Sequence, residues 1–250
     1  MNMTRNMIWF NECDSAIDYV ARRATIGPER YLVDSFLEKG IEGIGYSFRA
    51  EHMAVFVEPR IDSGFPDIVI AVYRPGYFSH WTKAREELSC TELKLLSYLY
   101  SVKGANSDQI RELLGLQPSS ILHSTELLSD AGLIVRDTER RIWSPRPIKE
   151  TFGLEHLVAI EAKVCNSQNV LDQAALNCRF ASESYALTSV NPSNGFSHRA
   201  KLAGIGVVSA SKRQTFRRFV KPRSFPLPSC YVSWQFNEWI GKRMVRKGLR

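Results

Sequence analysis

The sequence lacks the features that mark membrane and secreted proteins. None of the apolar runs in its 250 residues reaches the roughly 18 residues of a membrane-spanning helix. The apolar run at residues 7–10 is short and is followed by Asn11 and Glu12, so it does not match a signal peptide. These absences predict a soluble, cytoplasmic protein that does not bind a membrane.

Cysteine and histidine are too sparse and too scattered for a disulfide framework or a zinc centre. The chain has five residues of each type, and no two cysteines form a Cys-x-x-Cys pair. Structural zinc sites and disulfide-linked domains both need such residues at short, regular spacings. A bound metal is therefore expected to have oxygen ligands, as Mg²⁺ and Mn²⁺ have in proteins.

The composition is that of an ordinary globular protein. Hydrophobic residues make up 44% of the chain and charged residues 24%, which excludes a disordered, collagen-like or coiled-coil protein. The formal net charge of +7 is unevenly placed, because residues 195–250 contain 13 of the 33 Lys and Arg residues and one acidic residue, Glu238. This basic segment predicts a polyanionic partner, most simply nucleic acid. A solvated basic surface that only aids solubility is the alternative.

The hydrophobic pattern divides the chain into three stretches that together predict an α/β fold. Turn and capping residues separate the elements, such as Gly27-Pro28 before the first helix and Gly40 after it. The predicted elements are a helix over 28–39, strands over 52–59 and 67–73, three helices and a hairpin within 91–147, a strand over 157–164, a helix over 169–184, and strands over 185–190 and 204–209.

Residues 91–147 resemble a winged helix-turn-helix module. The predicted recognition helix, 120–131, contains no Lys or Arg and carries Glu126 and Asp130. A helix that reads DNA normally brings cations to the phosphates and base edges. Contact with DNA and contact with a protein, either a partner or a second copy of the chain, therefore both stay open. The residues of this stretch suited to DNA are those of the predicted wing, Arg136, Arg140 and Arg141.

Two predicted strands carry charges where apolar residues are expected. In the strand over 157–164, alternation places Glu161 and Lys163 on the same face. Asp67 directly precedes the apolar run of the earlier strand. If these strands are neighbours, Asp67 and Glu161 meet, and two adjacent carboxylates repel each other unless a cation lies between them. A salt bridge at a sheet edge is the simpler explanation for Glu161 and Lys163.

The Pro-Asp pair at 66–67 and the Glu-Ala-Lys run at 161–163 resemble the two motifs of the PD-(D/E)XK nuclease superfamily. A helix with an acidic residue precedes them and a helix with Gln173 follows them, as in that family. The resemblance implies a restriction-endonuclease-like mixed central sheet flanked by helices. It also implies Mg²⁺-dependent hydrolysis of phosphodiester bonds in DNA, with Mn²⁺ as a substitute metal.

The same resemblance implies a role for each site residue. Asp67 and Glu161 would bind the metal, and the carbonyl group of Ala162 would share its coordination sphere. Lys163 would orient or activate the attacking water and offset charge that develops on the phosphate. Gln173 would fix the site or the substrate backbone, although it also fits an ordinary boundary position on an amphipathic helix.

The first helix carries three acidic residues, Glu29, Asp34 and Glu38. At 100° per residue, Glu29 shares a face with the apolar residues, whereas Asp34 points toward solvent. We therefore prefer Glu29, which would hold a metal-bound water. Its alternative is a favourable interaction with the helix dipole in the first turn. Glu58, at the end of a predicted strand, is a second candidate for metal or water contact.

The two motifs lie further apart here than in the family, with 93 residues between Asp67 and Glu161. A folded insert whose ends are close costs little loop entropy, so the winged-helix stretch accounts for the gap. The prediction is a nuclease core over 1–88 and 150–250, interrupted by a winged-helix domain over 91–147. The basic, aromatic-rich tail supplies the remaining candidates for phosphate contact, Arg213, Arg217, Arg218, Lys221 and Arg223.

Two functions without catalysis also fit this sequence. In the first, the chain is a DNA-binding protein whose nuclease-like core is only a scaffold. In the second, it is a protein-interaction subunit of a nucleic-acid-processing or defence complex, assembled through the neutral winged helix. The presence of Asp67, Glu161 and Lys163 together argues against the first of these, and the second stays open.

Overall fold

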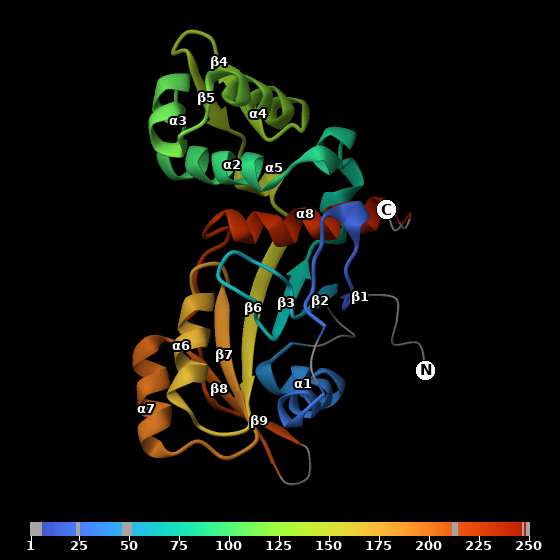
Figure 1. The fold of residues 1–250 in the computed structure, drawn as a ribbon, viewed down its shortest axis with the longest axis vertical. Coiled ribbons are helices and arrows are strands. Elements are labelled where there is room, and N and C mark those ends of the chain that lie inside the picture. Colours follow the sequence, from blue (N-terminus) through green and yellow to red (C-terminus); the bar gives the residue numbers. More distant parts are fainter. Residues whose placement is uncertain (1–6, 24–25, 47–51, 212–214, 247, 249–250) are drawn as a thin grey trace. The chain divides into compact units, whose positions relative to one another are not determined.

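The computed structural model describes residues 7–23, 26–46, 52–211, 215–246 and 248 (Figure 1). The chain forms two compact units, a sheet unit of residues 1–73 and 154–229 and an insert unit of residues 74–153 and 230–250. This division differs from the predicted one, because residues 74–88 and 230–250 group with the insert. The C-terminal segment thus crosses from the sheet unit into the insert unit.

The sheet unit is built on a mixed sheet of seven strands among the described residues. Its strand order is β1-β2-β3-β6-β7-β8-β9. The pairs β1–β2, β6–β7 and β7–β8 are parallel, and the other three neighbouring pairs are antiparallel. The predicted α/β class with a mixed sheet is confirmed. The strands are β1 Met7–Phe10, β2 Met53–Val57, β3 Ile68–Tyr73, β6 Leu154–Lys163, β7 Glu183–Thr188, β8 Gly206–Ala210 and β9 Phe216–Val220.

Helices cover both faces of this sheet (Figure 1). Helix α1, Pro28–Lys39, and the 3₁₀ turn η2, Ile41–Ile44, pack on one face. On the other face, α6, Gln168–Asn177, and α7, Asn194–Ala203, cover the last strands. A further 3₁₀ turn, η1, spans Ser15–Ile17. Because β2 and β3 are buried on both faces, their sequences are nearly continuous apolar runs.

Helix α1 has the bounds that the sequence predicts. Pro28 occupies its first turn, where the missing N–H group leaves no hydrogen bond unmade. The helix ends at Gly40, where a Cβ atom would lie 2.3 Å from the Phe36 ring and 2.9 Å from that of Phe216. A larger residue at position 40 would therefore displace the aromatic pair that closes this end of the core.

One predicted helix is wrong at its C-terminal end. We expected a helix over 169–184, but α6 stops at Asn177 and Ser184 lies inside β7. The residues after the helix contact the sheet instead: the Ser182 hydroxyl accepts a hydrogen bond from the backbone N–H of Leu157 in β6. Pairing of β7 with β6 buries Tyr185 and its neighbours, and this burial outweighs local helix propensity.

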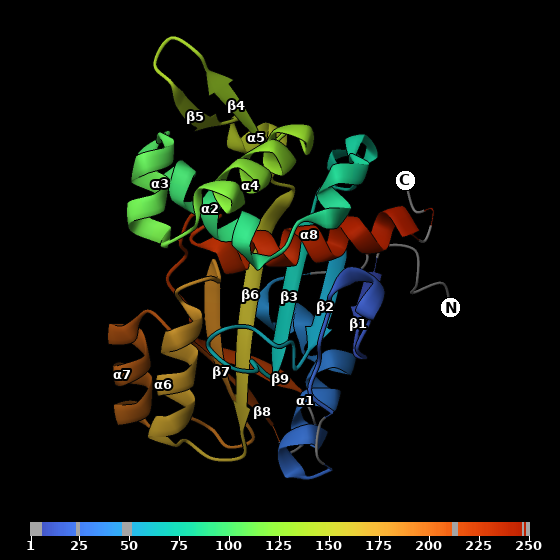
Figure 2. The same ribbon diagram turned by 45° about the horizontal axis from the view of Figure 1, so that its top comes forward.

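The insert unit contains three consecutive helices and a hairpin, as predicted (Figure 2). The first two begin with side-chain caps from Ser89 and Asn106, each part of a capping box. Its helices are α2 Cys90–Val102, α3 Ser107–Leu114, α4 Pro118–Asp130, α5 Ile148–Thr151 and α8 Tyr231–Arg246. The hairpin strands are β4 Ile134–Asp137 and β5 Ile142–Pro145, and the 3₁₀ segments are η3 Pro75–His80 and η4 Lys83–Glu87.

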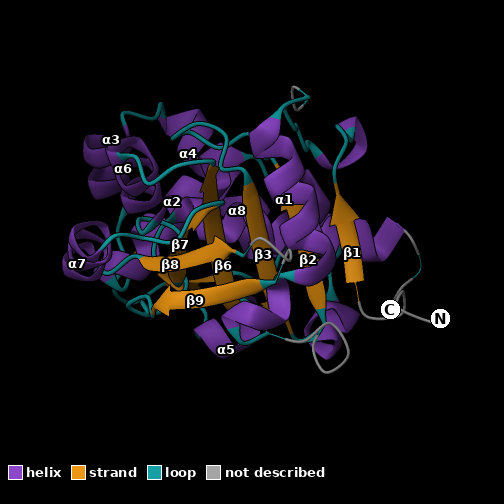
Figure 3. Cartoon of the chain, turned by 90° about the horizontal axis from the view of Figure 1, so that it is seen from below, coloured by secondary structure: helices purple, strands orange, loops and turns teal. Residues whose placement is uncertain are grey.

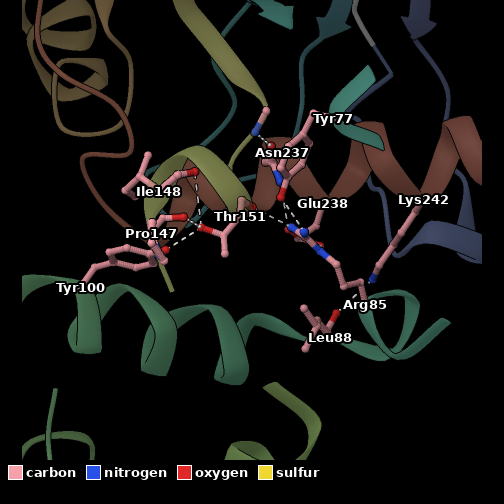
Figure 4. Close-up of polar contacts among 11 residues, drawn as sticks. Tyr77, Arg85, Leu88, Tyr100, Pro147, Ile148, Thr151, Asn237, Glu238 and Lys242 are labelled. Atoms are coloured by element: carbon pink, nitrogen blue, oxygen red, sulfur yellow. Dashed lines mark hydrogen bonds and ion pairs between the residues drawn. The ribbon is translucent and has the colours of Figure 1, made fainter. Parts of the chain in front are cut away.

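The C-terminal helix α8 is held in the insert unit by a buried ion pair (Figure 4). The Arg85 guanidinium donates to both carboxylate oxygens of Glu238, at 2.6 and 3.2 Å, and to the Thr151 carbonyl. Asn237 accepts a hydrogen bond from the backbone of Gly153. The aromatic residues of the helix are also core residues, since Trp234 and Trp239 are buried. This part of the basic tail is therefore structural rather than an exposed aromatic surface.

None of the helices formed by the described residues combines the length and apolar character needed to cross a membrane.

Candidate functional site

The pairing of β3 with β6 brings the two predicted acids together. In this antiparallel pair Ile68 is opposite Ile160, so Asp67, just before β3, lies next to Glu161. The backbone N–H of Ala162 donates a hydrogen bond to Oδ2 of Asp67 at 2.7 Å. The prediction that these strands are neighbours, despite the long insert between them, is confirmed.

Glu161 is a buried carboxyl group with a strongly raised pKa. Its own burial, the charge of Asp67 and a hydrogen bond with Asp67 raise the pKa to about 8, against an opposing hydrogen bond from Asn177. Nδ2 of Asn177 donates to Oε1 of Glu161 at 2.8 Å. Burial also raises the pKa of Asp67, although the Ala162 N–H works against this. Burial and their mutual repulsion thus both disfavour the charged forms of the two acids.

Lys163 forms an ion pair with Glu29 at the end of β6. Its Nζ donates to Oε2 of Glu29 at 2.7 Å, and the two side chains are 28% and 46% exposed. Burial disfavours the charged lysine, but the hydrogen bond and charge of Glu29, with the charges of Asp67 and Glu161, raise its pKa overall. The other acids of the helix pair elsewhere, Asp34 with Arg30 and Glu38 with Lys39. Glu29 is thus the α1 acid that reaches the site.

Glu58 contributes to the site through its backbone. Its N–H donates to the carbonyl oxygen of Asp67 at 3.1 Å, and its charge raises the pKa of Asp67. The residue has a φ of 47°, a left-handed conformation that is strained for a non-glycine residue. Its buried carboxylate forms an ion pair with Arg22. Strained backbone conformations of this kind cluster at functional sites.

The amide that contacts the site is Asn177 rather than Gln173. Gln173 is exposed on α6, and within the described residues it makes no hydrogen bond to the acids. Asn177 lies one helical turn after Gln173, on the buried face of α6 that also contains Val170 and Ala174. A polar residue at the end of an apolar helix stripe was the sequence signal that could have identified it.

The predicted nucleic-acid contacts fall in both units. In the insert unit, the guanidinium group of Arg136 lies over the Trp143 ring, and Arg140 interacts with Asp137 in the hairpin turn. Arg141, beside them, has a φ of 55°. In the sheet unit, Arg217 and Arg218 are on β9, with Lys221 and Arg223 just after it. Arg213 lies outside the described residues.

Asp67 and Glu161 suit a divalent cation by their chemistry. Hard cations such as Mg²⁺ take carboxylate oxygens, and a cation between the two acids would remove the repulsion that raises their pKa values. Across the ranges that the structure describes, however, no group of three or more His, Cys, Asp or Glu side chains is arranged to hold a metal ion. Any cation here would thus depend on two carboxylates, backbone oxygen atoms and water.

Comparison of the chain with protein-family models, with curated proteins and with solved structures found no match. The function has to be argued from the site itself.

Proposed function

We propose that the protein is a Mg²⁺-dependent nuclease of the PD-(D/E)XK type that hydrolyses phosphodiester bonds in DNA. The observation that carries the proposal is the direct contact of the Asp67 and Glu161 carboxyl groups, with a charged lysine two residues further along β6. Two carboxylates in contact repel each other, which costs stability unless a cation or a proton offsets the repulsion. Buried carboxyl groups whose pKa values are shifted by a neighbouring charge are typical of catalytic and metal sites.

The metal would be held by Asp67 and Glu161, with the Ala162 carbonyl as a further oxygen ligand. Such an ion polarises a phosphate and lowers the pKa of bound water. The Asn177 amide fixes the Glu161 carboxylate by its hydrogen bond. The Ala162 N–H does the same for Asp67. These contacts keep both carboxylates oriented before a ligand arrives, which is the support that a metal site requires.

Lys163 is the proposed catalytic cation. Its ammonium group, kept charged by Glu29, would stabilise the negative charge that develops on the phosphate and orient the attacking water. Glu29 is then a positioning residue that acts through Lys163, rather than the ligand of a metal-bound water as first expected. Gln173 is exposed on α6 and does not contact the acids, so contact with the substrate backbone is the role that this scheme leaves to it.

The insert unit is proposed to be a winged-helix module that contacts another protein. Its three helices and hairpin have the expected order, but α4 carries no Lys or Arg. A non-catalytic binding subunit is the alternative function. It is favoured by one observation, the lack of a third acidic or imidazole ligand among the described residues.

Cleavage assays with Mg²⁺ or EDTA separate these functions. We expect the wild-type protein to nick supercoiled plasmid or cut labelled single strands only with Mg²⁺ or Mn²⁺. Asp67→Asn and Lys163→Met should each lower the rate by about 10²–10³-fold, because each removes charge from the reacting centre. The controls Asp34→Asn and Lys201→Met, exposed in the same unit, should keep full activity. No cleavage of any DNA or RNA with either metal would support the binding subunit.

Loss of the ion pair between Glu29 and Lys163 is expected to lower the cleavage rate by a smaller factor. Glu29→Ala should lower kcat about tenfold with little change in KM, because Lys163 loses the partner that holds its ammonium group. Glu29→Gln keeps an acceptor oxygen and should recover part of the rate. Steady-state kinetics on a labelled oligonucleotide measures both effects. A Glu29→Ala variant that changes only KM would place Glu29 in substrate binding instead.

A further inference from the structure

The edge strand β9 lies in register with the candidate site. Across neighbouring strands Lys163 pairs with Thr188, Thr188 with Ser209, and Ser209 with Arg217. Residues directly opposite one another project from the same face of a sheet. Three strand spacings separate the Cα atoms of Lys163 and Arg217 by about 14–15 Å. Arg217 therefore lies on the face of the sheet that carries Lys163, on the edge strand β9, which runs beside β8 (Figure 3).

A β-bulge in β9 exposes an aromatic ring beside this arginine. Val207 pairs with Val220 and Val208 with Arg218, which leaves Phe219 as the extra residue of the bulged strand. Bulges redirect side chains, and Phe219 is 40% exposed. The guanidinium carbon of Arg217 lies 5.3 Å from the centre of its ring. The exposed Phe219 ring and the guanidinium plane beside it together form a platform on which a nucleic acid base could stack.

The cations around Phe219 are available to a ligand. Residues 215–225 contain four basic residues and no acidic residue. Arg218 is occupied, because its Nη1 donates to the carbonyl oxygen of Ile44 at 2.8 Å. Within the described residues, no ion pair to a carboxylate engages Arg217, Lys221 or Arg223. Arg223 lies over a second ring, Phe225, at 5.9 Å. The surface therefore offers two arginine–phenylalanine pairs with uncompensated positive charge.

We propose that this surface, defined by Arg217, Phe219, Lys221, Arg223 and Phe225, binds an unpaired nucleic acid strand and leads it to the Asp67–Glu161 site. Phosphates would contact the cations, and a base would stack on Phe219 and Arg217. Cations alone would fit any nucleic acid, because every nucleic acid has phosphates. An aromatic ring can stack only on a base whose face is exposed, and in a duplex the bases are stacked on one another. The substrate is then single-stranded or carries a single-stranded tail. This inference rests on the proposed function for the site.

Binding in EDTA tests the surface without cleavage. Fluorescence anisotropy is measured with labelled dT20, with rU20 and with a 20-base-pair duplex of mixed sequence. Phe219→Ala should weaken dT20 binding about tenfold, since stacking of one base is typically worth this much, and leave duplex binding within twofold. Arg217→Ala should weaken binding to all probes and reduce the salt slope by about one. Controls are Leu202→Ala and Arg199→Ala, exposed on α7 of the same unit.

The outcomes separate this inference from the proposed function. Wild-type-like dT20 binding by Phe219→Ala, or an equal loss on the duplex, overturns the inference even if the protein cleaves DNA. Selective loss of single-strand binding supports it. If the wild-type protein binds dT20 through Phe219 but never cleaves with Mg²⁺ or Mn²⁺, the surface stands and the nuclease proposal fails. Comparison of dT20 with rU20 distinguishes DNA from RNA as the bound strand. Circular dichroism confirms that each variant is folded.

Discussion

Glu161→Gln is expected to lower the rate of cleavage strongly and, at the same time, to stabilise the metal-free protein at neutral and alkaline pH. The loss of cleavage should be about 10²–10³-fold, because the amide cannot serve as an anionic ligand. Stabilisation is expected because the neutral amide removes the buried charge and its repulsion with Asp67. The Asn177 hydrogen bond can be kept by the amide oxygen. A purely structural residue would not combine these two effects.

The pH dependence follows from the raised pKa of Glu161. In the unfolded chain this carboxyl group titrates near 4.5, and in the folded protein near 8. Between these values the folded state holds a proton that the unfolded state has lost, so the free energy of unfolding falls as pH rises. The full contribution is present below about pH 4.5 and is lost once the pH passes about 8. The loss is on the order of 5 kcal/mol, because each pKa unit corresponds to about 1.4 kcal/mol.

Urea denaturation in EDTA at several pH values measures this effect. The wild-type protein should lose stability from pH 5 to pH 8, and Glu161→Gln should lose much less over the same range. Addition of Mg²⁺ at pH 8 should then raise the melting temperature of the wild-type protein but not that of the variant, because only a binding-competent folded state gains from the ligand. Parallel pH profiles for the two proteins would contradict the pKa, and equal responses to Mg²⁺ would contradict the metal site.

Glu238→Ala is expected to destabilise the insert unit by about 3–5 kcal/mol. The change leaves the Arg85 guanidinium buried without its bidentate carboxylate, and the remaining contacts with Tyr77 and the Thr151 carbonyl do not neutralise it. The pKa of Arg85 is raised by Glu238, against the effect of burial, so the arginine stays charged. Breaking one side of a buried pair costs more than the pair itself contributes.

Chemical denaturation followed by tryptophan fluorescence tests this prediction. The unit contains Trp81, Trp234 and Trp239 in its core, so its unfolding changes the signal directly. The control Glu112→Ala removes an exposed acid from α3 and should change stability by less than about 0.5 kcal/mol. A double variant, Arg85→Met with Glu238→Leu, removes both charges and should recover much of the loss. Equal stabilities of Glu238→Ala and the control would contradict the role assigned to the pair.

Much of the candidate site could be predicted from the sequence. Alternation along β6 identified Glu161 and Lys163 as charges on one face of a strand, and Asp67 stood out directly before an apolar run. The choice of Glu29 over Asp34 depended only on helical periodicity, and the ion pair with Lys163 agrees with it. These inferences used local patterns whose period is fixed by backbone geometry.

Other residues of the site could not be predicted because their roles depend on long-range packing. Asn177 contacts Glu161 because α6 ends over β6. The predicted helix continued to Ser184, so the sequence pattern did not identify Asn177 as a residue at the end of a helix. Glu58 reaches Asp67 through a backbone conformation that no local sequence rule indicates. The pKa of Glu161 is set by its burial and by the nearby charge of Asp67, and both of these depend on tertiary packing. Strand β9, with its bulge at Phe219, was also missing from the predicted elements.

The sequence by itself determined the α/β class, the bounds of α1, the helices and hairpin of the insert, and the charges that mark the candidate site. These features follow from hydrophobic period, capping residues and turns, which act over a few neighbouring residues. Tertiary structure alone decided that β3 and β6 are adjacent across the insert, and that α8 belongs to the insert unit rather than to a basic tail. Strand pairing and helix docking bury apolar surface between segments that are distant in the sequence. Which segments pair therefore depends on the whole chain and not on local sequence.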